Sequence, residues 1–427
     1  MDSYLMENKE QESKKNLFTR NFTLVVIGQI ISLFGNQIIR YAIPLYLLNE
    51  TKSAALYGMV LAMSFIPMLF MAPIGGIIAD RVNKRNVMVG LDFATAVLVF
   101  AYSQLRGHFG LVPLLVVTLM LLYAIQGAYS PAVQGAIPVL VDDENLMSAN
   151  AVINGVSSIS GIVGPVLGGI MFSLFGLQPI LLIGAVCFLL SSIMEIFIVI
   201  PFEKRKKEEG IFEIVKNDMK DSFWFITKEK PEIGKIVLIA AGINLVLSAL
   251  IIIGFPVIIT QHLDFTKEAA NRLQGVAQSA MAFGSLLGAM TAGVLAKKLK
   301  VKNIGIWFLA SSLMLVPMGV VMLMHVKGMP AFLVLAGAAF LMMTTSTVLN
   351  IEMITYIQLI APENMISKVM SLIMCLCMCA TPLGQLIYGM LFELFSDKIG
   401  IIFLAATLIS LLLAYACGKV VRNMEEK

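Results

Sequence analysis

Four ionisable side chains interrupt stretches of sequence that are otherwise apolar, and they are the residues best suited to chemistry: Arg40, Asp92, Glu195 and Glu352. A charged group is costly in apolar surroundings, so such residues are expected to have a function or a partner. Glu352 has no basic neighbour in sequence and can either exchange a proton or hydrogen-bond to an adjacent helix. Arg40 can attract an anionic ligand or reach the membrane interface. Glu195 lies close to a basic run at 204–207, so we expect it to extend towards the surface.

The sequence lacks the signatures of several enzyme classes. It has no Gly-x-x-x-x-Gly-Lys-Ser/Thr loop for a nucleotide phosphate, and no nucleophile, base and acid stand out together. Cys375, Cys377 and Cys379 alternate, but residues two apart on a helix point to nearly opposite sides. The sequence therefore predicts no enzyme activity, no cofactor and no metal site.

Composition places the chain in a membrane. Of its 427 residues, 58% are hydrophobic and 14% are charged, and the mean hydropathy is +0.87. Its uncharged runs exceed the roughly 20 residues that a helix needs to cross a bilayer. We expect twelve spans at about 22–48, 53–79, 86–105, 111–138, 148–175, 179–200, 236–260, 273–296, 303–324, 330–357, 368–394 and 399–418.

Lys and Arg gather in alternate loops, which predicts the orientation. The segments expected inside hold Arg81, Lys84, Arg85 and the run at 204–207, whereas the loops expected outside hold few basic residues. The positive-inside rule then predicts a multi-pass protein of the plasma membrane with the N- and C-termini in the cytoplasm. The formal net charge of +4 indicates contact with anionic lipid head groups rather than with nucleic acid.

The second half of the chain repeats features of the first at an offset of roughly 217 to 220 residues. The repeated segments are 75–85 with 293–300, 144–148 with 363–367, and 169–175 with 389–395. Because both copies run in the same direction, we expect an all-α membrane protein with two six-helix bundles around a central path. We expect no stable oligomer.

The predicted parts follow from this repeat. They are a cytoplasmic tail at 1–21, an N-terminal bundle at 22–200, a linker at 201–235 that contains an amphipathic helix, a C-terminal bundle at 236–418 and a cytoplasmic tail at 419–427.

The loop after the second span, Gly75 to Arg85, resembles the signature loop of the major facilitator superfamily. The resemblance implies the twelve-helix major facilitator fold and a conformational latch in which Asp80 gains and loses a partner as the protein changes state. The residues assigned to the latch are Gly76, Asp80, Arg81, Lys84, Arg85 and Asp92. A plain basic loop is the alternative interpretation. Asn83 departs from the family, which usually has Gly or an acidic residue there.

The fifth span resembles the Gly-Pro motif found in exporters of this superfamily. Proline removes a backbone donor and glycine allows close helix contact, so the helix can bend and seal against a partner. The residues concerned are Gly161, Gly164, Pro165, Gly168 and Gly169. A kinked packing helix without directional meaning is the alternative.

The segments around 128–151 and 350–369 resemble the drug and siderophore exporter branch that includes macrolide efflux proteins. In this family spans one, four, seven and ten normally line the path, which implies a mostly apolar path with a few polar groups. The candidate residues for binding substrate or protons are Asn36, Gln37, Arg40, Gln126, Asn350 and Glu352.

The resemblance implies a secondary exporter of amphipathic small molecules, multidrug or macrolide-like, that works by alternating access and proton antiport. Two alternatives are open. One is an exporter of an endogenous amphiphile such as a siderophore or lysolipid, and the other is a transport-inactive membrane sensor or scaffold. The expected partners are the substrate, protons and membrane lipids.

Overall fold

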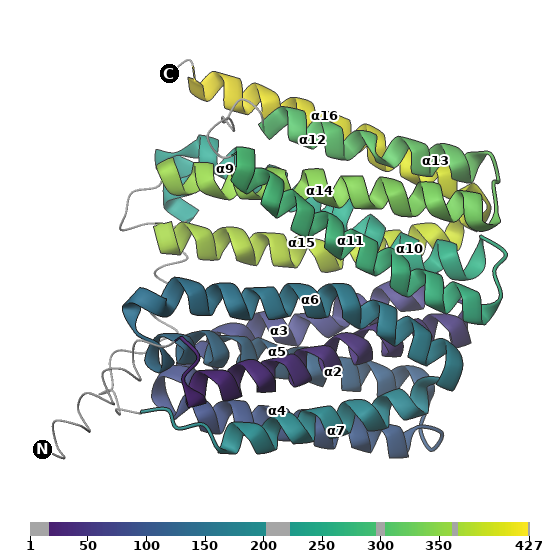
Figure 1. The fold of residues 1–427 in the computed structure, drawn as a ribbon. Coiled ribbons are helices and arrows are strands. Elements are labelled where there is room, and N and C mark those ends of the chain that lie inside the picture. The colour runs from purple at the N-terminus through teal and green to yellow at the C-terminus, as the bar shows by residue number, and fades with distance from the viewer. Residues whose placement is uncertain (1–16, 202–222, 296–303, 361–365, 426–427) are drawn as a thin grey trace, which may run out of the picture. The chain divides into compact units, whose positions relative to one another are not determined.

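The computed structural model describes residues 17–201, 223–295, 304–360 and 366–425, and these ranges are almost entirely helical (Figure 1). Within them the only β-type pairing is an isolated bridge between Arg106 and Phe109. Twelve helical segments of this part are long and apolar enough to cross a membrane, which confirms the predicted number of spans.

The first six spans are single helices, namely α2 (Arg20–Thr51), α3 (Ala54–Arg81), α4 (Lys84–Leu105), α5 (Leu111–Leu140), α6 (Asp143–Phe175) and α7 (Leu177–Ile196). Most begin or end a few residues from the predicted limits. Asn83 begins α4, because its side-chain oxygen accepts a hydrogen bond of 3.0 Å from the Arg85 backbone amide. Gly176, with φ +72°, connects α6 to α7 and adopts a conformation that favours glycine.

The second six spans contain more irregular helix. The elements of this half are η1 (Phe225–Glu229), which precedes the seventh span, and then α9 (Pro231–Ile243), η2 (Asn244–Ser248), α10 (Ala249–Gln261), α11 (Lys267–Leu295), α12 (Ile304–Leu313), α13 (Leu315–Leu323), α14 (Gly328–Ile360), α15 (Ile366–Leu394), η4 (Ser396–Lys398) and α16 (Ile399–Glu425). α16 continues through most of the segment predicted as a C-terminal tail. The predicted amphipathic helix of the linker and the basic end of the second repeat, 297–300, fall largely outside the described residues.

Two spans of the second half are interrupted for identifiable reasons. In the seventh span, η2 is a π-helical turn between α9 and α10, and the Asn244 side-chain amide donates to the Ala240 carbonyl at 3.0 Å. A side chain that enters the backbone ladder in this way is a known cause of irregular helix. In the ninth span, α12 ends and α13 begins at Met314, because Pro317 has no amide hydrogen to continue the ladder.

The chain divides into two compact units. The first contains residues 1–46 and 63–207, and the second contains residues 47–62 and 208–427. The predicted bundle boundary after residue 200 is close to this division. Residues 47–62, which form the end of α2 and the beginning of α3, belong to the second unit although they lie in the first half of the sequence.

Helix pairing inside each unit follows the sequence repeat. In the first unit the third and sixth spans, α4 and α7, pack together, and in the second unit the ninth and twelfth spans pair in the same way, with α12 and α13 lying end to end along α16 (Figure 1). The second and fourth spans meet where Gly75 of α3 lies against Ala128 of α5. The eighth and tenth spans meet where Gly284 of α11 lies against the Phe340 carbonyl of α14. Glycine permits these approaches because it has no side chain to separate the backbones.

Candidate functional site

Two acidic side chains are buried in the first unit, and both belong to a cluster of hydrogen-bonded polar residues. Asp92 is 3% exposed and Glu195 is fully buried. The Tyr129 hydroxyl donates to Glu195 Oε1 at 2.8 Å, and Gln29 Nε2 donates to the Tyr129 oxygen at 2.6 Å. The Ser32 hydroxyl donates to Asp92 Oδ1 at 3.1 Å. We call these five residues the buried carboxyl cluster.

Four helices of the first unit supply this cluster, with Gln29 and Ser32 on α2, Asp92 on α4, Tyr129 on α5 and Glu195 on α7. α2 meets α7 at Gly28, whose carbonyl accepts a hydrogen bond of 3.1 Å from the Ser191 hydroxyl. A Cβ atom at Gly28 would lie 3.7 Å from the Glu195 side chain, so the two helices are in direct contact at this level. The cluster is therefore held by helix packing rather than by a loop.

The carboxyl groups of the cluster are only partly satisfied. Asp92 Oδ2 and Glu195 Oε2 are buried without a hydrogen-bond partner, and among the described residues neither carboxyl group forms an ion pair. The two groups are also close enough to repel each other when both are charged. A buried carboxyl with no cation beside it is costly when ionised, so proton binding is the available way to neutralise it.

The prediction that Glu195 extends to the surface is wrong, because its side chain is fully buried and is held by Tyr129. The described contacts of Asp92 likewise lie in the cluster and not with the basic residues of the loop: the Arg85 guanidinium donates to Asn86 at 3.0 Å instead. A usable signal was present in the sequence, since Asp92 and Glu195 both lie inside apolar spans.

Three of the predicted path residues lie together in a second group of the first unit. Asn36 Nδ2 of α2 donates to Gln126 Oε1 of α5 at 2.9 Å, and Gln126 Nε2 donates to the Ser130 hydroxyl at 3.0 Å. The Arg40 guanidinium carbon lies 4.0 Å from the centre of the Tyr123 ring, which is a cation–π geometry. The Asn36, Arg40 and Gln126 side chains are partly exposed.

Gln37 has a different position, against the Gly-Pro helix. A Cβ atom at Gly164 would lie 2.6 Å from Gln37 Cβ, and one at Gly168 would lie 3.0 Å from the Tyr41 ring. A Cβ atom at Gly161 would have nothing within 4 Å of it, so this position is open. α6 is continuous through Pro165, and Gly169 is buried, so the glycines bring α6 onto α2 without breaking the helix.

The loop that resembles the family signature has Asp80 as its key residue, and the side chain of Asp80 lies outside the described structure. Around it, Asn83 Nδ2 donates to the Ile200 carbonyl at 3.2 Å, and Lys84 packs over Gly135 of α5. Arg81 is exposed, and Gly76 has nothing within 4 Å of its Cβ position. The loop thus contacts α5 and the segment that follows α7.

The two path residues predicted in the second unit, Asn350 and Glu352, both lie on α14 but differ in burial. Glu352 is 7% exposed, and both of its carboxyl oxygens are buried without a hydrogen-bond partner. Asn350, two residues earlier, is exposed. Glu352 is therefore a third buried carboxyl group, and unlike Asp92 and Glu195 it has no described partner. Among the described residues, no group of three or more His, Cys, Asp or Glu side chains is arranged to hold a metal ion.

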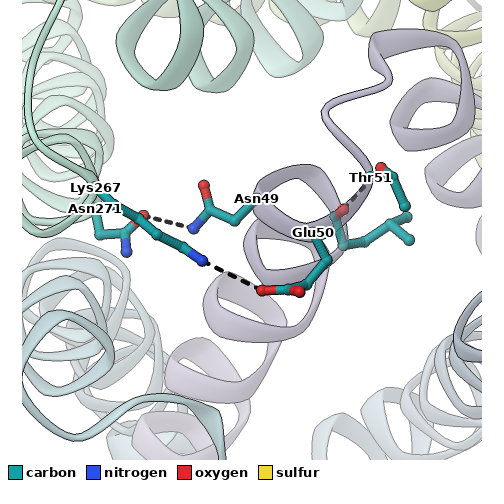
Figure 2. A network of polar contacts seen from close by, with 6 residues as sticks. Asn49, Glu50, Thr51, Lys267 and Asn271 are labelled. Carbon is teal, nitrogen blue, oxygen red and sulfur yellow. Dashed lines mark hydrogen bonds and ion pairs between the residues drawn. The ribbon is translucent and has the colours of Figure 1, made fainter.

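The end of α2 makes polar contacts with α11 that sequence reasoning missed (Figure 2). Asn49 Nδ2 donates to Asn271 Oδ1 at 2.8 Å, and Lys267 Nζ lies 3.2 Å from Glu50 Oε1 in an ion pair whose side chains are 56% and 41% exposed. All four residues belong to the second unit. An exposed ion pair contributes little by itself, so the Asn–Asn hydrogen bond is the more specific of the two contacts.

The beginning of α3 packs against α15 through glycine. A Cβ atom at Gly389 would lie 2.9 Å from the Ala54 carbonyl oxygen and 3.1 Å from Gly58 Cα, so the two backbones touch. Glu393, one turn further along α15, accepts a hydrogen bond of 3.2 Å from the Ala55 amide and so caps the start of α3. We call the contacts of residues 47–62 with α11 and α15 the 47–62 seal.

Comparison with curated proteins gives partial matches. The chain is 27% identical over 189 residues to macrolide efflux protein A of Streptococcus pyogenes, which covers 44% of this chain and 47% of that protein. It is 30% identical over 161 residues to the lysophospholipid transporter LplT of Yersinia pestis (strain Pestoides F), which covers 37% of each. The matches thus span less than half the length of these relatives.

Solved structures match over nearly the whole fold. The nucleoside transporter NupG superposes with a TM-score of 0.72 at 13% identity, covering 95% of this chain and 99% of that one. A bacterial homologue of the iron transporter ferroportin in its inward-facing state superposes with a TM-score of 0.70 at 17% identity, covering 94% and 99%. Identities this low establish the fold alone.

The model of the family described as Major Facilitator Superfamily matches residues 25–384, which includes nearly all of the first unit's spans and most of the second unit's. With twelve spans, a repeated helix pairing and this match over most of its length, the chain is a multi-pass membrane transporter that belongs to the Major Facilitator Superfamily.

Proposed function

We propose that the protein exports amphipathic small molecules, multidrug or macrolide-like, across the plasma membrane in exchange for protons. The single observation that carries the proton part is the buried carboxyl cluster, in which Asp92 and Glu195 share a site with no described cation. The names of the relatives support the substrate class, since a macrolide and a lysophospholipid both join a polar part to an apolar one. Both termini are proposed to lie in the cytoplasm, as the distribution of basic residues indicates.

The cluster suits proton exchange because its two carboxyl groups repel each other when both are charged. Binding one proton removes that repulsion and lowers the cost of burial, whereas releasing it requires water to reach the site. The cluster joins α2, α4, α5 and α7, so a change in its charge acts on four helices of one unit. Alternating access then follows if the two protonation states favour different arrangements of the helices.

Glu352 is the second position proposed for the coupling proton, because both of its oxygens are buried without a partner. It belongs to the second unit, and the cluster belongs to the first. A neutral Gln at either position imitates the protonated state permanently. Whichever carboxyl group carries the proton, its Gln variant should still bind substrate but fail to accumulate it under a pH gradient.

The test is pH-gradient-driven uptake of a macrolide into everted vesicles by Glu195→Gln, Glu352→Gln and a control, Glu268→Gln, whose side chain is exposed in the first turn of α11. We expect the control to match wild type and Glu195→Gln to lose gradient-driven accumulation. Full accumulation by both Glu195→Gln and Asp92→Asn would contradict the cluster assignment. Loss confined to Glu352→Gln would transfer the role to that residue.

The loop after α3 is proposed to act as the conformational latch, with Asp80 as its central charge. Asp80→Asn should insert normally and slow or abolish transport, because the two states lose their charge balance. Undiminished transport by a normally expressed Asp80→Asn protein would leave the loop with a role in topology only.

A second candidate function is export of an endogenous amphiphile such as a lysolipid, and the similarity to a lysophospholipid transporter favours it. Uptake of labelled lysophospholipid by the same everted vesicles distinguishes the two. Accumulation of the lysolipid without accumulation of macrolide would support the second candidate, and neither accumulating would favour the sensor or scaffold alternative.

A further inference from the structure

An apolar groove lies in the second unit between η2, α15 and α16. It encloses a volume of about 550 Å³ and is lined mainly by aliphatic side chains, among them Val246, Ile387, Ile401, Ala405 and Ile409. Volumes of this size are typical of small-molecule and cofactor sites. Leu245 and Val246 of the π-helical turn η2 form one of its walls.

The groove is open along its length. Ile387 is 47% exposed, Ile401 is 52% exposed and Ile409 is 47% exposed, although all three belong to membrane-spanning helices. Ile387 also points to the side of α15 opposite to Gln385 and Gly389, which touch the 47–62 seal, because residues two apart on a helix face away from each other. The material that meets such a face in a membrane is hydrocarbon.

One end of the groove carries a positive charge. Lys398, in the last position of η4, lines the groove and is exposed, and no carboxylate of the described residues forms an ion pair with it. The adjacent Asp397 lines a separate polar cavity with His262 and Asp264, so it belongs to other surroundings. An unpaired lysine at the mouth of an aliphatic groove matches the two parts of an anionic lipid, a charged head group and an apolar chain.

We propose that this groove binds one acyl chain of an anionic phospholipid whose head-group phosphate pairs with Lys398. The lipid comes from the leaflet on the side of the 262–266 and 324–327 loops, where Lys398 lies. Its bound chain fills the space between α15 and α16 and so supports the packing of the twelfth span. The site does not depend on the substrate or on the coupling ion of the transporter.

Native mass spectrometry of the full-length, delipidated protein tests the proposal by titration with phosphatidylglycerol and with phosphatidylcholine of the same chains. We expect one phosphatidylglycerol to bind about fivefold more tightly than phosphatidylcholine, as one lysine near a membrane surface would give. Lys398→Gln should abolish that preference, and Lys327→Gln, in a neighbouring loop of the same unit, should keep it.

The chain part of the site is tested with two matched variants. Ala405→Trp fills the groove and should abolish retention of both lipids, whereas Ala416→Trp, on the same face of α16 about three turns further on, should change neither. Equal binding of the two lipids by wild type, or unchanged retention by Ala405→Trp, would overturn the proposal. So would displacement of phosphatidylglycerol by a macrolide, since the groove would then be a substrate site.

Discussion

The 47–62 seal offers the sharpest test of the proposed alternating access, through the substitution Gly389→Leu. A Cβ atom at this position would lie 2.9 Å from the Ala54 carbonyl and 3.1 Å from Gly58 Cα, and both of these are backbone atoms that cannot rotate away. The added side chain should therefore separate α15 from α3. Gly337→Leu on α14 is the matched control, because nothing lies within 4 Å of its Cβ position.

The expected magnitude follows from two opposing effects. Replacing a helical glycine stabilises either helix by up to about 1 kcal/mol, and the control shows this effect alone. Overpacking typically costs about 1–3 kcal/mol, and this cost falls only on the arrangement in which the seal is closed. The population with an open seal should then increase between about fivefold and about 150-fold relative to the control.

The assay uses a reporter cysteine at Ala54, whose side chain is 2% exposed in the closed seal. The rate of maleimide labelling of Ala54→Cys in the purified protein, corrected for the five native cysteines, reports the fraction of open seal. Gly389→Leu should increase this rate and Gly337→Leu should leave it unchanged. Equal rates in the two variants would refute the view that the glycine crossing holds the seal.

Three further predictions concern other parts of the molecule. Gly164→Leu should lower the thermal unfolding temperature, because its Cβ would lie 2.6 Å from Gln37 Cβ, whereas Gly161→Leu should not; equal melting would show that α6 does not depend on this contact. Tyr129→Phe should destabilise the first unit by about 1–3 kcal/mol, since it leaves Gln29 and Glu195 without their shared partner, and unchanged unfolding in a denaturant titration would argue against the cluster as a structural unit. Burial lowers the pKa of His262 below its ordinary value of 6.5, although nearby backbone carbonyls and carboxylates oppose this, so the neutral ring contributes stability that is complete above that value and is lost as the pH falls through the lowered pKa. The melting temperature of wild type should thus fall more between about pH 7.5 and about pH 5.5 than the melting temperature of His262→Gln. An equal fall in the two proteins would contradict a stabilising role of the neutral His262 ring.

Much of the fold was predictable because the membrane imposes a simple rule on sequence. An apolar run of sufficient length must be a helix in lipid, so the number of spans and most of their limits follow from composition. The close crossing of α3 and α5 also has a local signal, the small residues around Gly75. The repeat indicated two related halves, and in the structure the third and sixth spans pair in one half as the ninth and twelfth do in the other.

The buried carboxyl cluster was less predictable because its contacts join distant residues. Glu195 meets Tyr129 across 66 positions, and Tyr129 meets Gln29 across 100. The local sequence around Glu195 instead indicated a surface position, since basic residues follow it closely. The direction in which a helical residue points depends on the neighbouring helices, and one sequence contains no direct record of them.

The assignment of residues 47–62 to the second unit has a consequence for the order in which the protein is made. Asn49 and Ala55 leave the ribosome early, but their partners Asn271 and Glu393 follow 222 and 338 positions later. At a synthesis rate of about 5–20 residues per second, the tip of this first hairpin, residues 47–62, is made roughly 10–70 s before its partners. During that interval its polar groups must be hydrated or held by an insertion factor. Synthesis that stops before α15 would leave a nascent chain whose first hairpin is inserted but whose tip is still accessible to proteases.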